Sequence, residues 1–278
     1  MSDRAASPSA LLEADLAPPR VAMVDVVATH DAGDVEDRHD GEGDGGPLTR
    51  YCGGKNGSGV WQRLISMMPP HDDYIEAFLG SGAIIRRKRA APGLNVGIDV
   101  DAGVIAAHDV ARDRKYTLVC GDAVAWLRDH CRARRKRRVL VYCDPPYLGS
   151  SRAWPDRRCY AHEMKGGFEH AELLQILTTL PAMVMINGYA CPQYDLTLAG
   201  WRRIEYQAPT RGGLKTEVVW MNFPEPTELH DYRFLGADFH ERCRIRRKIA
   251  RNVAKLAALP ALERAAVIAG INAGAGGE

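Results

Sequence analysis

Short apolar runs alternate with segments of helical period between residues 51 and 226 of this 278-residue chain. The runs are rich in β-branched residues and have no polar face, which is typical of strands buried on both sides of a parallel sheet. The alternation predicts an α/β fold with helices on both faces of the sheet. The expected strands are 74–78, 95–99, 117–121, 139–143 and 182–187, and the expected helices are 82–90, 102–112, 123–134 and 168–180.

Two later runs, 201–208 and 217–223, flank the glycine-containing turn "PTRGGLK". They predict a terminal hairpin, so the mostly parallel sheet should be mixed. Residues 232–272 have a helical pattern, and Pro260 should begin a second helix there.

Residues 1–49 show no periodicity and are rich in Ala, Asp, Gly and Pro. This composition predicts a disordered acidic tail. We therefore expect three parts: the tail at 1–49, a globular domain at 50–228 and a helical appendage at 229–278.

Charge is distributed unevenly along the chain. Residues 1–50 hold 11 acids and 4 bases, a balance of −7, so a net charge of +2 leaves +9 on the remainder. A basic body suggests a polyanionic partner. The seven cysteines form no C-x-x-C pair, which favours reduced thiols in a cytoplasm over a disulfide framework or a zinc site. No apolar run approaches a membrane span, and no signal peptide is evident.

Glycines or carboxylates follow the first three expected strands. Phe78, Gly80 and Gly82 follow the first strand, where glycines let a backbone pass close to a ligand. Asp99 ends the second strand and suits the two hydroxyls of a ribose. Asp122, after the third, could reach the amine of an adenine ring or cap the next helix. Because ligands of such sheets bind at the carboxyl ends of the strands, these tips together predict a cleft for a nucleoside.

The fourth strand ends in Asp144-Pro145-Pro146-Tyr147. The two prolines fix an extended tip that keeps its carbonyl acceptors. A carboxylate and a carbonyl can each accept one hydrogen of an aromatic amine, and the tyrosine ring can stack on its heterocycle. Two such acceptors would localise the nitrogen lone pair for attack on an electrophilic methyl group. Asp144, Pro145 and Tyr147 are therefore the candidate catalytic residues, and none of this chemistry needs a metal.

The order F-x-G-x-G followed by Asp-Pro-Pro-Tyr resembles the S-adenosylmethionine-dependent adenine-N6 DNA methyltransferases. The chain is most similar to the Dam-type (D12) class, which includes many phage and prophage enzymes. The resemblance covers about residues 51–226. It is carried by "YCGGK", "PPHDDYIEAFLGSGAIIRRK", "IDVD", "CGDA", "CDPPY", "GGFEHAELLQIL", "INGYACPQYD" and "TEVVWMNF".

This resemblance implies a Rossmann-like class I methyltransferase fold, with S-adenosylmethionine as cofactor and no metal. It implies DNA as partner and a target adenine flipped out of the duplex. It adds Tyr51 and Lys55 to the cofactor contacts Phe78, Gly80, Gly82, Asp99, Asp122 and Asp144. We expect a protein of the cytoplasm of a bacterium or phage-infected cell, without membrane association, and a monomer or weak dimer.

Cations and rings are interleaved in the loop after the catalytic tip, residues 148–165. Cations for phosphates and rings for stacking favour contact with a flipped-base complex. The candidate DNA-binding residues are Arg152, Trp154, Arg157, Arg158, Tyr160 and Lys165 of this loop, with Arg211 of the hairpin turn.

Three other basic stretches are ambiguous. "RARRKRR" (132–138) and "RRKR" (86–89) should lie at the opposite end of the strands, so solvated loops are favoured there over DNA contacts. The segment 240–259 has an apolar stripe with cations largely off it. It fits a helix packed on the body, a helix along the DNA backbone, or both.

Only 21 residues separate Asp122 from Asp144, which leaves no room for the recognition insertion usual in the Dam-type class. We therefore expect a short or relaxed target. Two alternatives remain: methylation of RNA or another amine, and a non-catalytic DNA-binding relic.

Overall fold

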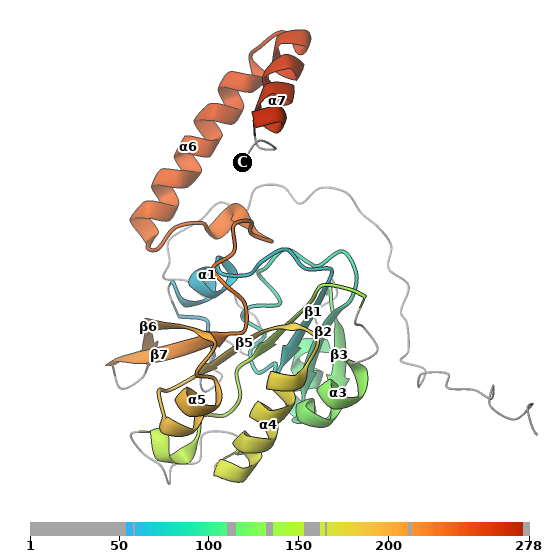
Figure 1. Ribbon diagram of the computed structural model, residues 1–278, viewed down its shortest axis with the longest axis vertical. Helices are drawn as coiled ribbons and strands as arrows, with labels where there is room; N and C mark the ends of the chain where they lie inside the picture. Colours follow the sequence, from blue (N-terminus) through green and yellow to red (C-terminus); the bar gives the residue numbers. More distant parts are fainter. Residues whose placement is uncertain are drawn as a thin grey trace, which may run out of the picture. The chain divides into compact units, whose positions relative to one another are not determined.

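A seven-stranded mixed sheet forms the centre of the protein (Figure 1). The computed structural model describes residues 54–57, 59–109, 115–131, 136–152, 162–164, 166–210 and 213–274. The strands lie in the order β3-β2-β1-β4-β5-β7-β6. The first five are mutually parallel, and β7 is antiparallel to both β5 and β6. The order 3-2-1-4-5 is that of a doubly wound sheet. The predicted Rossmann-like class I methyltransferase fold is confirmed, and so is the terminal hairpin.

The observed elements follow the predicted alternation closely. The strands are β1 (Asp73–Ala77), β2 (Asn95–Asp99), β3 (Thr117–Cys120), β4 (Val139–Cys143), β5 (Met183–Gly188), β6 (Arg202–Thr210) and β7 (Gly213–Met221). The α-helices are α1 (Val60–Ile65), α2 (Ala102–Asp109), α3 (Ala123–His130), α4 (Gly167–Thr179), α5 (Pro192–Thr197), α6 (Phe239–Ala257) and α7 (Ala261–Gly274). Short 3-10 turns are η2 (Gly149–Ser151) and η3 (Tyr232–Phe234).

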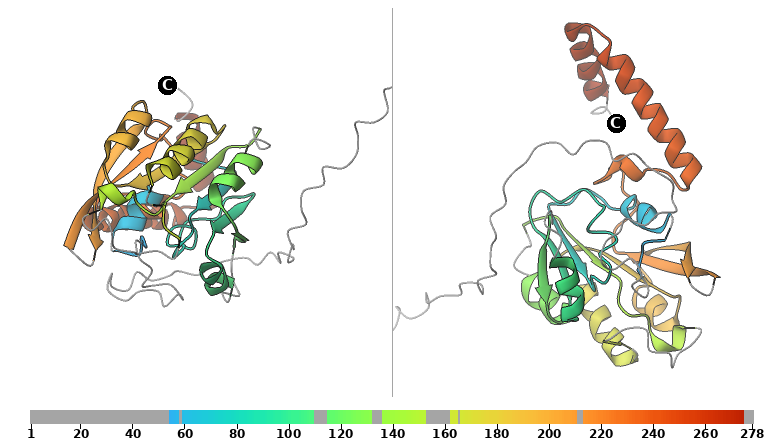
Figure 2. Two further views of the ribbon diagram at one scale, coloured as in Figure 1. Left: turned by 90° about the horizontal axis from the view of Figure 1, so that it is seen from below. Right: turned by 180° about the vertical axis from the view of Figure 1, so that it is seen from behind.

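Each central strand is buried on both faces, as its continuous apolar sequence predicts. In β4, Val139, Val141 and Cys143 pack in one core with side chains of α3, α4 and α5. Leu140 and Tyr142 point the other way, into a second core with α1. Figure 2 shows these helices on either side of the sheet. Because both faces are covered, only the strand ends remain open to a ligand.

The predicted helix 82–90 is wrong, because this segment forms a series of turns. A regular helix would bond the Ile85 amide to the carbonyl of Ser81. Instead, the Ile85 amide donates to Oε2 of the Glu76 side chain at 2.7 Å. Gly82, with φ of +60°, also lies outside the right-handed helical region. The buried carboxyl group of Glu76 on β1 therefore takes over part of the local hydrogen bonding.

Residues 230–234 pack on the globular body. The His230 ring stacks on His71 with ring centroids 3.8 Å apart, and Phe234 meets Trp61 of α1 edge to face at 4.8 Å. Helices α6 and α7 follow, as the helical pattern and Pro260 predict. Within the described part of the chain, no helix is both long and apolar enough to cross a membrane. The predicted acidic tail lies outside the described residues.

Candidate active site

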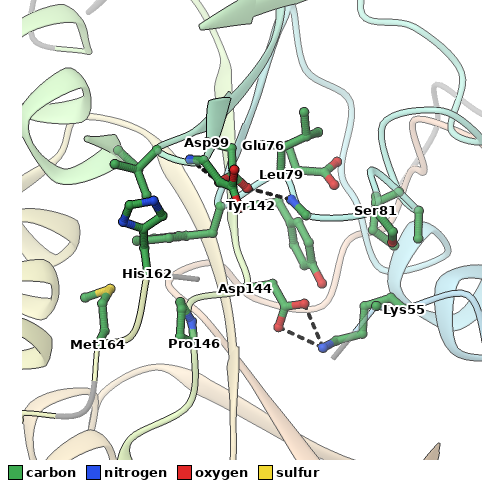
Figure 3. Close-up of a pocket in the computed structure, with 18 of the residues that line it drawn as sticks. Lys55, Glu76, Leu79, Ser81, Asp99, Tyr142, Asp144, Pro146, His162 and Met164 are labelled. Atoms are coloured by element: carbon green, nitrogen blue, oxygen red, sulfur yellow. Dashed lines mark hydrogen bonds and ion pairs between the residues drawn. The ribbon is translucent and has the colours of Figure 1, made fainter. Parts of the chain in front are cut away.

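A pocket of about 220 Å³ opens at the carboxyl ends of β1, β2 and β4 (Figure 3). It is the place where the strand-tip motifs were expected to meet. Of the predicted site residues, Lys55, Phe78, Gly80, Asp99, Asp122 and Asp144 line it. Gly82, Pro145 and Tyr147 are not among its lining residues, and Tyr51 lies outside the described residues. Among the described side chains, no group of three or more His, Cys, Asp or Glu is arranged to hold a metal ion.

The loop after β1 bends sharply along one wall of the pocket. Phe78, Gly80 and Gly82 have φ values of +62°, +48° and +60°, and Phe78 is the one described non-glycine residue with positive φ. A Cβ atom at Gly82 would lie 2.6 Å from Cε1 of His108, so glycine is required there by space as well as by φ. His108, buried on α2, holds the loop through a hydrogen bond between its Nε2 and the Gly80 carbonyl. No sequence signal marked His108.

Asp99 shapes the same loop. Its Oδ2 accepts from the Gly80 amide at 2.9 Å, and its Oδ1 accepts from the Asp101 amide at 3.0 Å. Burial raises the pKa of Asp99, and these two amides oppose the rise. Each carboxylate oxygen keeps acceptor capacity for a hydroxyl in the pocket. Asp101, directly before α2, accepts from the Gly103 amide at 2.8 Å and so caps the start of that helix.

Asp122 both caps a helix and lines the pocket. Its Oδ1 accepts from the Ala125 amide at 2.7 Å, so the capping interpretation is correct. The same side chain lies at the pocket wall contributed by β3. The two interpretations of Asp122 are therefore compatible.

The Asp144 carboxylate is held by an ammonium group that sequence reasoning did not pair with it. Lys55 Nζ lies 2.8 Å from Oδ1 and 2.7 Å from Oδ2, and Figure 3 shows the two side chains pointing toward each other. The same Nζ lies 3.4 Å from Oε2 of Glu217 on β7. Burial raises the pKa of Asp144, and the Lys55 charge opposes this rise. The pKa of Lys55 is itself raised, because the two carboxylates outweigh its burial.

Tyr147 belongs to the same buried network. Its hydroxyl accepts from Lys55 Nζ at 2.8 Å and donates to Glu217 Oε2 at 2.8 Å. Tyr206 of β6 donates to the same oxygen at 2.8 Å, and the Tyr189 ring meets the Tyr147 ring edge to face at 4.7 Å. The tyrosine is only 8% exposed, so its ring is fixed by the protein in this structure. Stacking of Tyr147 on a base stays a prediction.

Glu76 is a second pocket carboxyl that sequence reasoning missed. It lies on β1, and both the Tyr74 hydroxyl and the Ile85 amide donate to its Oε2. Burial raises the pKa of Glu76 to about 8, so it is mostly protonated at neutral pH in this structure. An acid inside the apolar strand "YIEAF" was the available signal.

Arg152 holds the segment Asp144–Tyr147 in place by a hydrogen bond to its last carbonyl. Its Nε donates to the Tyr147 carbonyl at 2.6 Å, and its Nη1 pairs with Glu163 at 2.8 Å. With 9% of its side chain exposed, it holds the two ends of the following loop together, and DNA contact by Arg152 stays a prediction. The other candidate DNA-binding residues, Trp154, Arg157, Arg158, Tyr160, Lys165 and Arg211, lie outside the described residues.

Replacing Asp99 with Ala should weaken S-adenosylmethionine binding. The change removes an acceptor for the ribose and two hydrogen bonds that hold the glycine loop. Hydrogen bonds to a charged acceptor are worth about 1.5–3 kcal/mol, so the Kd should rise about 10- to 150-fold. Calorimetric titration measures this, with Asp101→Ala as a neighbouring control that should change Kd less. An unchanged affinity in Asp99→Ala would contradict the cleft assignment.

Comparisons by sequence find no matching family model and no matching curated protein. Solved structures with a similar fold include N-methyltransferase NodS from Bradyrhizobium japonicum WM9 (10% identity, TM-score 0.40, covering 59% of this chain and 93% of that one). Another is a SAM-dependent methyltransferase from Methanosarcina mazei (9%, 0.40, 57% and 95%). A third is magnesium protoporphyrin IX methyltransferase from Synechocystis PCC 6803, with bound SAM (13%, 0.36, 58% and 74%).

Proposed function

We propose that this protein transfers a methyl group from S-adenosylmethionine to N6 of an adenine flipped out of DNA. The observation that carries the proposal is one continuous pocket lined by two chemically different groups of residues. Asp99, Asp122 and the glycine loop line it from the tips of β1, β2 and β3, and Asp144 with Pro146 lines it from the tip of β4. The first group suits a nucleoside, and the second suits an aromatic amine.

The residues present fit this cofactor. The Asp99 carboxylate can accept hydrogen bonds from ribose hydroxyls, and Asp122 can accept from an adenine amine. Glu76 offers a carboxyl for the ammonium group of the methionine part. A bound ammonium would lower the pKa of Glu76 from about 8, because a nearby positive charge favours the carboxylate. S-adenosylmethionine would supply an electrophilic methyl group on a sulfonium ion.

Asp144 would orient the target amine and accept its hydrogen bond. With S-adenosylmethionine bound, the nitrogen lone pair would form the new bond to the methyl carbon, and the electrons of the broken carbon–sulfur bond would remain on sulfur. The amine would then lose a proton, which the Asp144 carboxylate could accept and pass to solvent. The Lys55 ammonium favours the ionised form of the buried Asp144, since it lies within 2.8 Å of both carboxylate oxygens. One oxygen can accept from Lys55 and from the amine together.

The test is product analysis. The pure protein is incubated with methyl-labelled S-adenosylmethionine and duplex DNA, and the DNA is digested to nucleosides and examined by mass spectrometry. We expect the label in N6-methyldeoxyadenosine. Parallel reactions with RNA and single-stranded DNA test the alternative substrates. Label in RNA only would overturn the proposal, and so would label in cytosine.

Sequence context in the same reaction tests the relaxed target. Duplexes of random sequence, read for methylated adenine, should show methylation in many contexts. A good bidentate base contact is worth about 1–3 kcal/mol, and a recognition domain supplies several of them. A strict motif of several bases would show that this protein reads sequence with other segments.

A further inference from the structure

Helix α6 presents one strongly basic face. Five cations recur at spacings of three, four and seven residues, which places them on the same side of a helix. All five are exposed. They are Arg244, Arg247, Lys248, Arg251 and Lys255.

Little within the helix neutralises this face. Between Phe239 and Ala257 the chain has seven Lys and Arg residues and one acid, Glu241, a net charge of +6. Glu241 pairs with Arg244 at 3.2 Å. The other four cations of the face form no ion pair with any residue that the structure describes.

Packing of an apolar stripe does not explain these charges. The stripe of Ile245, Ile249, Val253 and Leu256 lies on the other side of α6. Ile249 and Val253 are 47% and 59% exposed, so the stripe is itself poorly covered. The basic face is therefore explained neither by apolar packing of α6 nor by an ion-pair network among the described residues.

Helix α6 has a well-defined N-terminal cap. Asp238 caps it by accepting from the Glu241 amide at 2.8 Å. Just before it, Asp231 is buried and accepts from the Arg89 amide at 2.9 Å, which ties the preceding segment to the body. The cations are therefore carried on a regular helix that begins at an anchored segment.

We propose that the basic face of α6 binds the phosphate backbone of duplex DNA without reading its sequence. The proposal rests on the proposed function and adds a DNA-binding element to it. Arg244 and Lys255 are 11 positions apart, about 16 Å at ~1.5 Å per residue. Duplex DNA carries a negative charge for about every 1.7 Å of its axis, so a face of this length meets several phosphates. Such contacts would provide part of the DNA affinity that a recognition insertion provides in the Dam-type class.

The experiment compares two triple variants of the full-length protein. The test variant carries Arg247→Gln, Lys248→Gln and Lys255→Gln. The control carries Arg89→Gln, Lys115→Gln and Lys136→Gln, which removes the same residue types and the same charge from exposed sites elsewhere. Binding to a fluorescein-labelled duplex is measured by anisotropy over a range of salt concentrations, without cofactor.

Each lost phosphate contact should reduce the slope of log K against log salt by about 0.9, so the test variant should lose up to about 2.7. The control should keep the wild-type slope. The proposal would be overturned if the test variant kept the wild-type salt slope. It would also be overturned if the control variant lost as much of the slope as the test variant. Binding of duplex RNA but not DNA through the same residues would overturn the choice of DNA.

The two proposals fail separately. Because binding is measured without cofactor, the salt slope reports on α6 whether or not methyl transfer occurs. Both proposals are supported if the test variant has a reduced salt slope but still methylates DNA normally at saturating DNA. Absence of N6-methyladenine with an altered slope would reject the proposed function alone. Melting temperature and calorimetric binding of S-adenosylmethionine confirm that each variant is folded.

Discussion

Asp144→Ala should reduce kcat by about a hundredfold or more, equivalent to about 2.7 kcal/mol of transition-state stabilisation. The variant removes the carboxylate that accepts from the target amine. Binding of S-adenosylmethionine should change less than kcat, because Asp99, Asp122 and the glycine loop are untouched. Single-turnover assays with labelled cofactor measure the loss, and Asp101→Ala, another pocket carboxylate, is the matched control.

Wild-type kcat should also fall on acidification, as Asp144 becomes protonated. Because burial raises the pKa of Asp144, this fall should begin at a higher pH than for an ordinary aspartate. Asp144→Asn should lack the acidic limb. Retention of a tenth of the wild-type kcat in Asp144→Ala would show that the catalytic assignment is wrong.

Lys55→Met should destabilise the protein more than any other single change in the pocket. Two carboxylates, Asp144 and Glu217, lose the ammonium that lies 2.7 and 3.4 Å from them. Breaking a buried ion pair by removing one partner costs about 3–5 kcal/mol. Urea unfolding at neutral pH measures this difference in the free energy of unfolding.

The loss should depend on pH in a defined direction. Without Lys55, the folded-state pKa of Asp144, which burial already raises, should rise further above its unfolded value because the opposing positive charge is gone. The penalty is then present above that raised pKa and disappears as pH falls below the unfolded value. Lys55→Met should therefore approach wild-type stability in acid.

The double variant Lys55→Met/Glu217→Gln provides the internal control. It removes one of the two uncompensated charges and keeps an acceptor for Tyr147 and Tyr206. It should recover part of the lost stability at neutral pH. If the single variant is as stable as wild type at neutral pH, the ammonium does not balance the two carboxylates.

The fold was predictable because buried strands have a local signature. Apolar runs such as 139–143 identify strands, and the rule that ligands lie at carboxyl ends placed Asp99, Asp122 and Asp144 around one pocket. The prediction of a helix at 82–90 failed because the conformation of this segment depends on a tertiary hydrogen bond. Its periodicity suits a helix, but the carboxyl group of Glu76 accepts the hydrogen bond of the Ile85 amide instead.

Ion pairs and hydrogen bonds between residues far apart in the sequence could not be predicted from local sequence patterns. Lys55 and Asp144 are 89 residues apart in the sequence, and Glu217 reaches them from β7. A motif resemblance assigned Lys55 to the cofactor, but it did not show which carboxylates would share its charge. Tyr147 was expected to offer a ring surface, and its burial follows from the hydroxyl contacts that only the assembled sheet provides.

The Arg152–Glu163 ion pair closes the base of the segment after the catalytic tip, with 2.8 Å between nitrogen and oxygen. Both ends are further fixed, by the Tyr147 carbonyl on one side and by a His170 contact with the Met164 carbonyl on the other. The closure entropy of a loop grows slowly, by about 0.6 kcal/mol for each doubling of its length. A change in the number of residues between Arg152 and Glu163 should therefore cost little free energy of folding and leave the Asp144–Tyr147 segment in place.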